Sequence, residues 1–163
     1  MNATAAHARP DIALRGAGLR DVVAIWRLQK MIFGRDAYDA LTIGLMLLDP
    51  RQIHLQALCE GEAVGFIDCE RNFFESTMWI VMVGTHPRFW GRGIASALIG
   101  EAERRAAGQA TRLKLTVRRS NERAIALYTH LGFEHATVSV RYYNDGEDGL
   151  IMEKPLPRPT IEV

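Results

Sequence analysis

Residues 83–99, VGTHPRFWGRGIASALI, contain a strand end, a turn with Gly91 and Gly93, and the start of a helix. Residues 78–85 form a nearly continuous apolar run of strand length, which indicates a central strand buried on both faces. The two glycines let the backbone turn tightly and approach a ligand without a Cβ in the way. Free N–H groups and the dipole at the helix N-terminus favour an anion such as a diphosphate. The segment therefore predicts a phosphate-binding turn, with a plain tight turn into a helix as the alternative.

The residues around the two glycines support phosphate binding and exclude two common phosphate-binding motifs. Arg88 and Arg92 would add charge-assisted hydrogen bonds to a phosphate. No lysine follows Gly93, so the turn is not a Walker loop, and the third glycine of a dinucleotide-binding turn is absent. The turn by itself therefore does not identify the ligand.

Hydrophobic periodicity on both sides of this turn predicts the other elements. Helices are expected at 22–33, 38–48, 94–107 and 121–131, and strands at 12–15, 53–59, 63–70, 78–85, 113–117, 138–143 and 150–154. This order predicts an α/β fold, with a mixed sheet and flanking helices rather than a repeated strand–helix–strand unit. We expect one domain over 1–163, with a loose leader at 1–10.

Composition is that of an ordinary globular chain and argues against several classes of function. The 163 residues carry 20 basic and 19 acidic side chains, a formal net charge of +1, which gives no support for nucleic-acid or membrane binding. Cys59 and Cys69 lack metal-type partners nearby and suit a reducing compartment. No apolar run approaches the length of a membrane span. We therefore expect a cytoplasmic protein without a metal site, and the apolar stretch 41–48 leaves an oligomer interface or a substrate pocket open.

With these neighbours, the stretch 83–99 resembles the acetyl-CoA-binding segment of the GNAT superfamily of N-acetyltransferases. In that family the turn reads Arg/Gln-x-x-Gly-x-Gly/Ala; Gly93-Ile94-Ala95 matches its end, and Trp90 stands where the family has Arg or Gln. The resemblance implies that the strand end pairs its backbone with the pantetheine arm and the acetyl carbonyl, while the helix start holds the pyrophosphate. The acetyl-CoA-binding residues that it implies are Val83, Gly84, Thr85, Arg88, Trp90, Gly91, Arg92, Gly93, Ile94, Ala95, Ser96 and Asn121.

A second stretch, LTVRRSNERAIALYTHLGFEHA at 115–136, resembles the other motif of the family. It matches at Asn121, Ala124, Leu127, Tyr128, Gly132 and Phe133. Asn121 is suited to cap a helix, to contact the cofactor, or to do both. Tyr128 is either a core aromatic or, as the resemblance implies, the general acid that protonates the leaving CoA thiolate. A phenol suits that role because its pKa, about 10, lies above that of a thiol, about 8.5.

The end of the chain resembles a narrower group of enzymes. The stretch VSVRYYNDGEDGLIMEKPL at 138–156 is similar to the end of the ribosomal-protein alanine N-acetyltransferases and related protein N-terminal acetyltransferases. In those enzymes a tyrosine of this hairpin helps to hold the backbone of the substrate peptide. The resemblance therefore implies that Tyr142 and Tyr143 contact the acceptor, with ordinary strand packing as the alternative. Phe33 and Tyr38 are the other residues expected at the acceptor site.

The general base is the role that the sequence leaves open. The N-terminal acetyltransferases that this tail resembles carry a glutamate five residues before the motif asparagine, and here that position is Thr116. A threonine hydroxyl cannot accept a proton at neutral pH. Glu70 is the first candidate for the role. The other candidates are Glu75, Asp68 and His86.

Together the resemblances imply an acetyl-CoA-dependent N-acetyltransferase with the GNAT fold, in which an amine attacks the thioester directly. Neither cysteine has an obvious activating histidine, so no covalent enzyme intermediate is expected. Backbone N–H groups near Val83 and Gly84 would stabilise the developing oxyanion. The expected acceptor is a protein N-terminus. There are two alternatives: an enzyme that acetylates a small-molecule amine, and a non-catalytic domain that binds acetyl-CoA. Thr116 favours both alternatives over a protein acceptor. Tyr128 argues against the non-catalytic domain, which needs no general acid.

Overall fold

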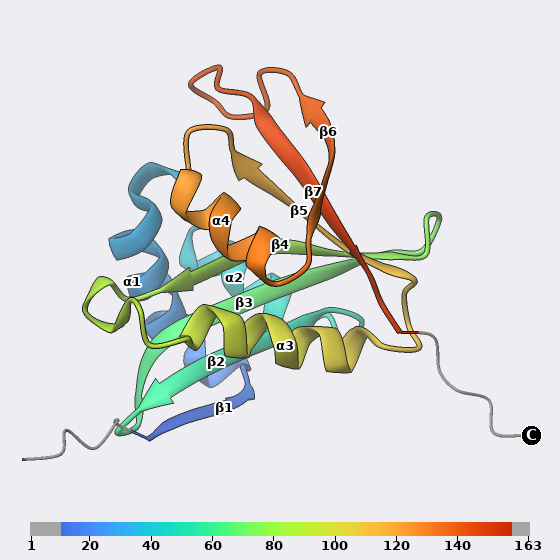
Figure 1. The fold of residues 1–163 in the computed structure, drawn as a ribbon. Coiled ribbons are helices and arrows are strands. Elements are labelled where there is room, and N and C mark those ends of the chain that lie inside the picture. Colours follow the sequence, from blue (N-terminus) through green and yellow to red (C-terminus); the bar gives the residue numbers. More distant parts are fainter. Residues whose placement is uncertain (1–10, 158–163) are drawn as a thin grey trace, which may run out of the picture.

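A seven-stranded mixed sheet forms the centre of the molecule, in the order β1-β2-β3-β4-β5-β7-β6 (Figure 1). The computed structural model describes residues 11–157, and the expected leader at 1–10 lies outside the described residues. The strands are β1 (Ile12–Gly16), β2 (Ile53–Cys59), β3 (Glu62–Asn72), β4 (Thr77–Thr85), β5 (Arg112–Arg118), β6 (Glu134–Ser139) and β7 (Gly149–Pro155). The α-helices are α1 (Val22–Phe33), α2 (Ala40–Leu47), α3 (Ile94–Ala106) and α4 (Glu122–His130), and the 3₁₀ turns are η1 (Leu19–Asp21), η2 (Gly34–Asp36) and η3 (Pro87–Phe89). The predicted order of strands and α-helices is therefore confirmed.

Local sequence explains where several helices begin and end. α1 ends at Gly34, which takes a positive φ of 56°. Asp39 caps α2, because its side chain accepts a hydrogen bond from the N–H of Thr42 at 2.9 Å. Asn121 caps α4 in the same way by accepting from Ala124 at 3.1 Å, which confirms the cap expected from the sequence. None of the helices within residues 11–157 is long and apolar enough to cross a membrane.

The sheet packs against different helices on its two faces. On one face the larger hydrophobic cluster includes Leu98 of α3 and Tyr128 of α4. On the other face a smaller cluster joins Ile25 of α1, Ile43 of α2 and Phe66 of β3. Helices on both faces explain why β2 and β3 are buried along most of their length.

β4 and β5 are paired at one end and separate at the other. Their parallel pairing joins residues 77–80 to residues 112–115 and then stops. β4 continues to Thr85 without a partner on the β5 side, and a register shift against β3 leaves Val81 as an extra residue. The expectation that this strand is buried throughout is wrong for residues 79, 81–83 and 85, which are half-buried. The two strands therefore form an opening in the sheet, which is visible where they diverge in Figure 1.

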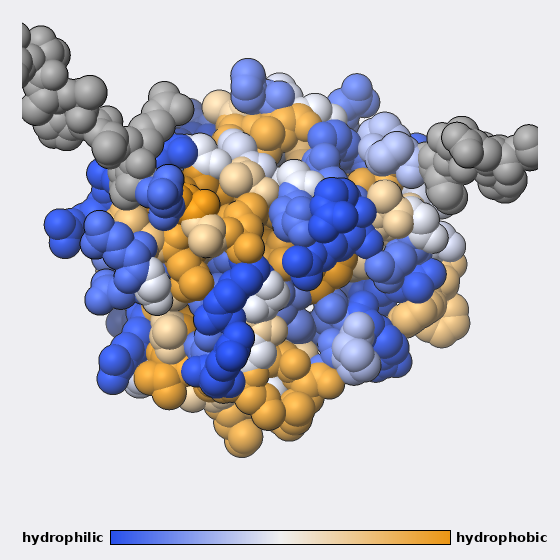
Figure 2. Space-filling model, turned by 90° about the horizontal axis from the view of Figure 1, so that it is seen from below, coloured by the Kyte–Doolittle hydropathy of each residue, from blue (hydrophilic) through white to orange (hydrophobic). Residues whose placement is uncertain are grey.

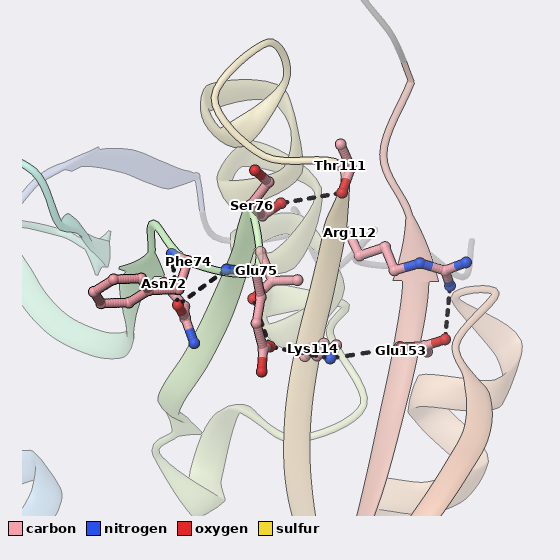
Figure 3. Close-up of polar contacts among 9 residues, drawn as sticks. Asn72, Phe74, Glu75, Ser76, Thr111, Arg112, Lys114 and Glu153 are labelled. Atoms are coloured by element: carbon pink, nitrogen blue, oxygen red, sulfur yellow. Dashed lines mark hydrogen bonds and ion pairs between the residues drawn. The ribbon is translucent and has the colours of Figure 1, made fainter.

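Polar contacts hold the closed end of the β4–β5 opening together (Figure 3). Thr111 donates to the carbonyl of Ser76 from its backbone N–H, at 2.7 Å, and from its hydroxyl, at 3.1 Å. Lys114 of β5 pairs with Glu75 at 3.4 Å and with Glu153 of β7 at 4.0 Å. These contacts join the β3–β4 hairpin to β5, so the two strands separate only at their far ends.

The expected strand at 138–143 is wrong at both ends, because β6 already begins at Glu134. β6 ends at Ser139. Arg141 takes a φ of 50°, a left-handed conformation that a strand does not use, and its N–H donates to the side chain of Asp148 at 2.9 Å. The tyrosine pair that follows therefore lies in the β6–β7 loop and not in a strand.

Hydrophobic side chains also reach the surface, and Figure 2 shows them interspersed with hydrophilic ones over the underside of the molecule. Leu41 and Leu45 of α2, and Leu48 just after it, are exposed, whereas Ile43 is buried against the smaller cluster. The apolar stretch 41–48 therefore turns much of its surface outward. A partner for this surface stays a prediction.

Candidate active site

The predicted phosphate-binding turn lies between the open end of β4 and the first turn of α3. Gly91 and Gly93 have positive φ angles of 76° and 77°, and a Cβ on either would meet no other atom within 4 Å. The left-handed backbone explains the glycines, and the open space leaves room for a ligand. The first bond of α3 runs from the N–H of Ala97 to the carbonyl of Gly93 at 2.9 Å. The N–H groups of residues 94–96 are therefore free of helix partners.

The charge at this turn favours an anion. Arg88 and Arg92 are exposed, and neither forms an ion pair within residues 11–157. α3 has no acidic side chain in its first turn. The side chain of Ile94 points into the core, where its Cγ2 would lie 2.8 Å from a Cβ on Gly65. Ile94 therefore offers the turn only its backbone, and a phosphate there would meet N–H donors and two cations.

Tyr128 of α4 is packed into the core, yet its hydroxyl is free to act. The residue is 9% exposed, and its ring meets Phe133 edge-on with centroids 5.9 Å apart. Within the part of the chain that the structure describes, its hydroxyl makes no hydrogen bond. Burial, with a smaller contribution from Tyr143, raises the pKa of Tyr128 to about 12. A phenol with this pKa stays protonated at neutral pH and is able to donate its proton.

Arg118, at the end of β5, connects three segments at the open end of the sheet. Its guanidinium donates to Asp36 of η2 at 2.9 Å, and to Asp145 and Glu147 of the β6–β7 loop at 2.8 and 2.9 Å. The same group lies over the ring of Tyr143, 4.0 Å from its centroid. One side chain therefore joins the segment after α1 to the loop before β7. We call these five residues the Arg118 cluster.

Of the tyrosines expected at the acceptor site, Tyr143 belongs to this cluster and Tyr142 lies beside it. Tyr142 and Tyr143 meet edge-on with centroids 5.0 Å apart. A Cβ on Gly149 would lie 3.1 Å from Tyr142 and 2.5 Å from the methyl group of Thr116, so only glycine lets these two side chains come together. Burial and then the neighbouring Tyr142 raise the pKa of Tyr38. The structure thus brings Tyr142, Tyr143 and Thr116 into one place, and Tyr38 is near enough to Tyr142 for an electrostatic interaction.

Phe33, the fourth residue expected at the acceptor site, lies behind the end of β4. Its ring meets Phe66 edge-on with centroids 6.2 Å apart, within the smaller hydrophobic cluster. A Cβ on Gly84 would lie 3.2 Å from Phe33 and 3.0 Å from Ile32. Gly84 therefore allows α1 to approach the strand that borders the opening.

Three of the four candidates for the general base are engaged in other contacts. Asp68 is buried and lies 2.7 Å from Nδ1 of His54. Glu75 pairs with the lysine at the closed end of the opening. His86 accepts a backbone N–H with its Nδ1 at 3.1 Å and so caps η3. Glu70 is exposed on β3 and makes no hydrogen bond or ion pair with any other described residue, which leaves its carboxylate free.

The comparison with protein families decides the class of this protein. The model of the acetyltransferase (GNAT) family matches residues 19–133. The chain belongs to the GNAT family. It is 38% identical over 111 residues to the [ribosomal protein bS18]-alanine N-acetyltransferase of Escherichia coli K12, a match that covers 65% of this chain and 73% of that protein.

Solved structures of GNAT proteins share the fold. The ribosomal-protein-S18-alanine N-acetyltransferase from Escherichia coli superposes with a TM-score of 0.82 at 23% identity and covers 94% of this chain and 99% of its own. NAA60 from Arabidopsis thaliana, in complex with acetyl-CoA, superposes with a TM-score of 0.80 at 17% identity and covers 89% of this chain and 99% of its own. The predicted GNAT fold is therefore confirmed.

This GNAT protein is an acetyl-CoA-dependent N-acetyltransferase. Its residues fit acetyl-CoA in three ways: the unpaired edge of β4, the free N–H groups at residues 94–96 and the arginines at the turn. Thr85 adds a fourth, because its Oγ1 is buried at the end of the unpaired edge without a hydrogen-bond partner among the described residues. An orphaned polar atom at this place is expected where a polar ligand binds.

Sequence reasoning missed two arginines that contact the expected site residues, Arg118 and Arg123. Arg118 holds the cluster described above, and Arg123 lies over the ring of Trp90, 4.3 Å from its centroid. Both are close to the motif asparagine, in the basic stretch VRRSNER at 117–123, which was the available signal. The partners could not be found from sequence because they come from distant segments.

Proposed function

We propose that this GNAT enzyme acetylates the N-terminal amine of a protein. The observation that carries the proposal is that Tyr142 lies beside both Tyr143 and Thr116, in a loop that Arg118 joins to the segment after α1. Such a frame suits one extended chain end, whose backbone polar groups would meet tyrosine hydroxyls. The curated relative at 38% identity is named for an alanine of a ribosomal protein, which supports the same class of acceptor.

In this proposal the donor lies along β4 and the start of α3. The pantetheine arm would pair with the free backbone edge of residues 83–85. The diphosphate would accept hydrogen bonds from the N–H groups of residues 94–96, with Arg88 and Arg92 beside it. Asn121 caps α4 and borders the same opening from the other side.

The chemistry follows from positioning and two proton transfers. The acceptor amine attacks the carbonyl carbon of the thioester, so that a C–N bond forms and the C–S bond breaks. Backbone N–H groups of Val83 and Gly84 would stabilise the oxyanion. Tyr128 would give the proton of its hydroxyl to the departing sulfur, and Glu70 would take the proton of the amine, directly or through a water.

The test of the acceptor class uses matched substrates. A peptide with a free alanine N-terminus, the same peptide with a blocked N-terminus and an internal lysine, and a panel of small amines are each incubated with acetyl-CoA. Release of free CoA thiol and the mass of the products are measured. We expect acetylation only of the free N-terminus. Acetylation of the small amines alone would overturn the proposal in favour of a small-molecule acetyltransferase.

The test of the base compares pH–rate profiles. Glu70→Gln should flatten the acidic limb of kcat/KM, because it removes the free carboxylate, and Glu75→Gln, at the closed end, should leave the profile unchanged. Thr116→Glu restores a carboxylate beside Tyr142 and should raise the rate on peptides. A rate that follows only the titration of the substrate amine in wild type and Glu70→Gln alike would exclude Glu70.

A further inference from the structure

Trp90 departs from the family motif and forms a stack with Arg123. It stands where GNAT proteins have Arg or Gln, and its indole N–H donates to the carbonyl of Thr85 at 2.9 Å. Its ring, half exposed, lies under the guanidinium of Arg123 from the first turn of α4. The stack therefore bridges the two elements that flank the β4–β5 opening, at the end where β4 leaves the sheet.

Arg123 keeps its hydrogen-bond donors available in this arrangement. A guanidinium stacked on an aromatic ring is held flat, and its N–H groups point outward in the plane. Arg123 forms no ion pair with another residue between 11 and 157, whereas the nearby Arg119 lies 3.7 Å from Asp148. Arg92 is placed in a similar way over Phe89, 4.9 Å from the ring centroid. A preorganised, unpaired guanidinium is suited to a phosphate.

The covalent order of coenzyme A indicates which phosphate Arg123 would meet. Its thioester and pantetheine belong in the opening, and its diphosphate belongs at the N–H groups of α3. The group that follows is the adenosine with its 3′-phosphate, which must leave the opening past the turn that carries Trp90. The backbone of α3 already serves the diphosphate, and Arg123 comes from the opposite side of the opening.

We propose that Trp90 and Arg123 form the site for the 3′-phosphoadenosine end of coenzyme A. Arg123 donates to the 3′-phosphate, and Trp90 is the positioning residue that holds Arg123 flat. The pair makes the enzyme select coenzyme A over its dephosphorylated form. This inference rests on the donor placement of the proposed function and not on the identity of the acceptor.

Calorimetric binding of CoA and of 3′-dephospho-CoA to the full-length protein tests the proposal without any acceptor. Wild type should bind CoA about tenfold more tightly than dephospho-CoA, as expected for charge-assisted hydrogen bonds to one phosphate. Arg123→Met should bring the ratio close to one while the affinity for dephospho-CoA stays unchanged. Trp90→Gln, which restores the family residue, should lower the ratio several-fold. Arg104→Met removes the same charge at the far end of α3 and should keep the wild-type ratio.

Two results would overturn the assignment. Equal weakening of CoA and dephospho-CoA in Arg123→Met would place Arg123 at the diphosphate. An unchanged ratio would remove it from the donor site altogether. Melting temperature and circular dichroism show that each variant is folded. Wild type that binds CoA but acetylates no peptide would refute the proposed acceptor and leave this test intact.

Discussion

The two regions proposed to bind the donor and the acceptor are built in different ways. The donor end is almost one continuous segment, residues 83–96, in which backbone N–H groups supply most of the expected contacts. The acceptor end depends on side chains that meet across the fold, such as Asp36 and Arg118, which are 82 positions apart. A ligand that every family member shares is bound by backbone, which tolerates change of side chain. An acceptor that differs between members is held by side chains, which change readily.

The two ends also differ in how their charges are satisfied. At the donor end, Arg92 and Arg123 lie on aromatic rings without a carboxylate among the described residues. At the acceptor end, Arg118 is surrounded by carboxylates, and its hydrogen bond to Asp36 is the main cause of its raised pKa. The unpaired guanidinium groups of Arg92 and Arg123 would be available to the phosphates of the donor. The paired guanidinium group of Arg118 holds two loops together.

The largest effect should come from Tyr128, the proposed general acid. Tyr128→Phe keeps the ring and removes the hydroxyl, so we expect kcat to fall by about 10²–10⁴-fold. Acetyl-CoA affinity should hardly change. Because the pKa of Tyr128 is raised to about 12, wild-type kcat should show no alkaline limb below about pH 10. Thr129→Val is the control, because it removes an exposed hydroxyl one position later on α4, where that hydroxyl donates only to the carbonyl of Ile125. Full turnover in Tyr128→Phe would return this residue to a packing role.

Gly93→Val tests whether the backbone N–H groups of the turn bind the phosphates of the donor. A β-branched side chain at φ 77° strains the turn and covers the N–H groups, so we expect CoA to bind about 10–100-fold more weakly. Gly108→Val is the matched control, because Gly108 has a φ of 80° and equally open surroundings at the other end of α3. Both variants should lose similar stability in thermal melts. Weakened CoA binding in both, or in neither, would show that the phosphates bind elsewhere.

Arg118→Met tests the acceptor end. Loss of the cluster should raise the KM for peptides about tenfold, because the two loops are no longer held together, and should leave the KM for acetyl-CoA unchanged. Arg112→Met is the control, since Arg112 begins the same strand and pairs with Glu153 at 2.6 Å, away from the opening. Equal changes in both KM values would mean that Arg118 acts on the fold as a whole.

The smallest effect concerns the pKa of Glu147 in the Arg118 cluster. Hydrogen bonds from Ser120, and then from Arg118, lower the pKa of Glu147 to about 2. Its ordinary value is about 4.3, so its contribution to stability is present above that pH and is lost as pH falls through about 2. NMR titration of the Glu147 carboxyl carbon measures this directly. Ser120→Ala should raise the pKa, and Ser139→Ala should not; an unshifted wild-type pKa would show that the cluster is open in solution.

Most of the fold follows from local patterns, and the errors have physical causes. Apolar periodicity, Gly34 after α1 and Asn121 before α4 place the helices correctly. The strand expected at 138–143 was placed too far along the chain, since β6 spans Glu134–Ser139. The residue types at 140–143 favour a strand, but Arg141 turns the chain to meet Asp148. The separation of β4 from β5 has no signal in sequence either, because it depends on where pairing stops.

The sequence by itself determined the family, the order of the strands and α-helices, and the glycine turn before α3. These depend on consecutive residues, since a helix cap or a left-handed glycine is set by neighbours in the chain. Only the tertiary structure decided that Arg118 joins the acceptor loops, that Arg123 lies on Trp90, and that Glu70 alone among the base candidates keeps a free carboxylate. Those contacts join residues from separate elements, and a pairing across the fold exists only once the sheet and helices have packed.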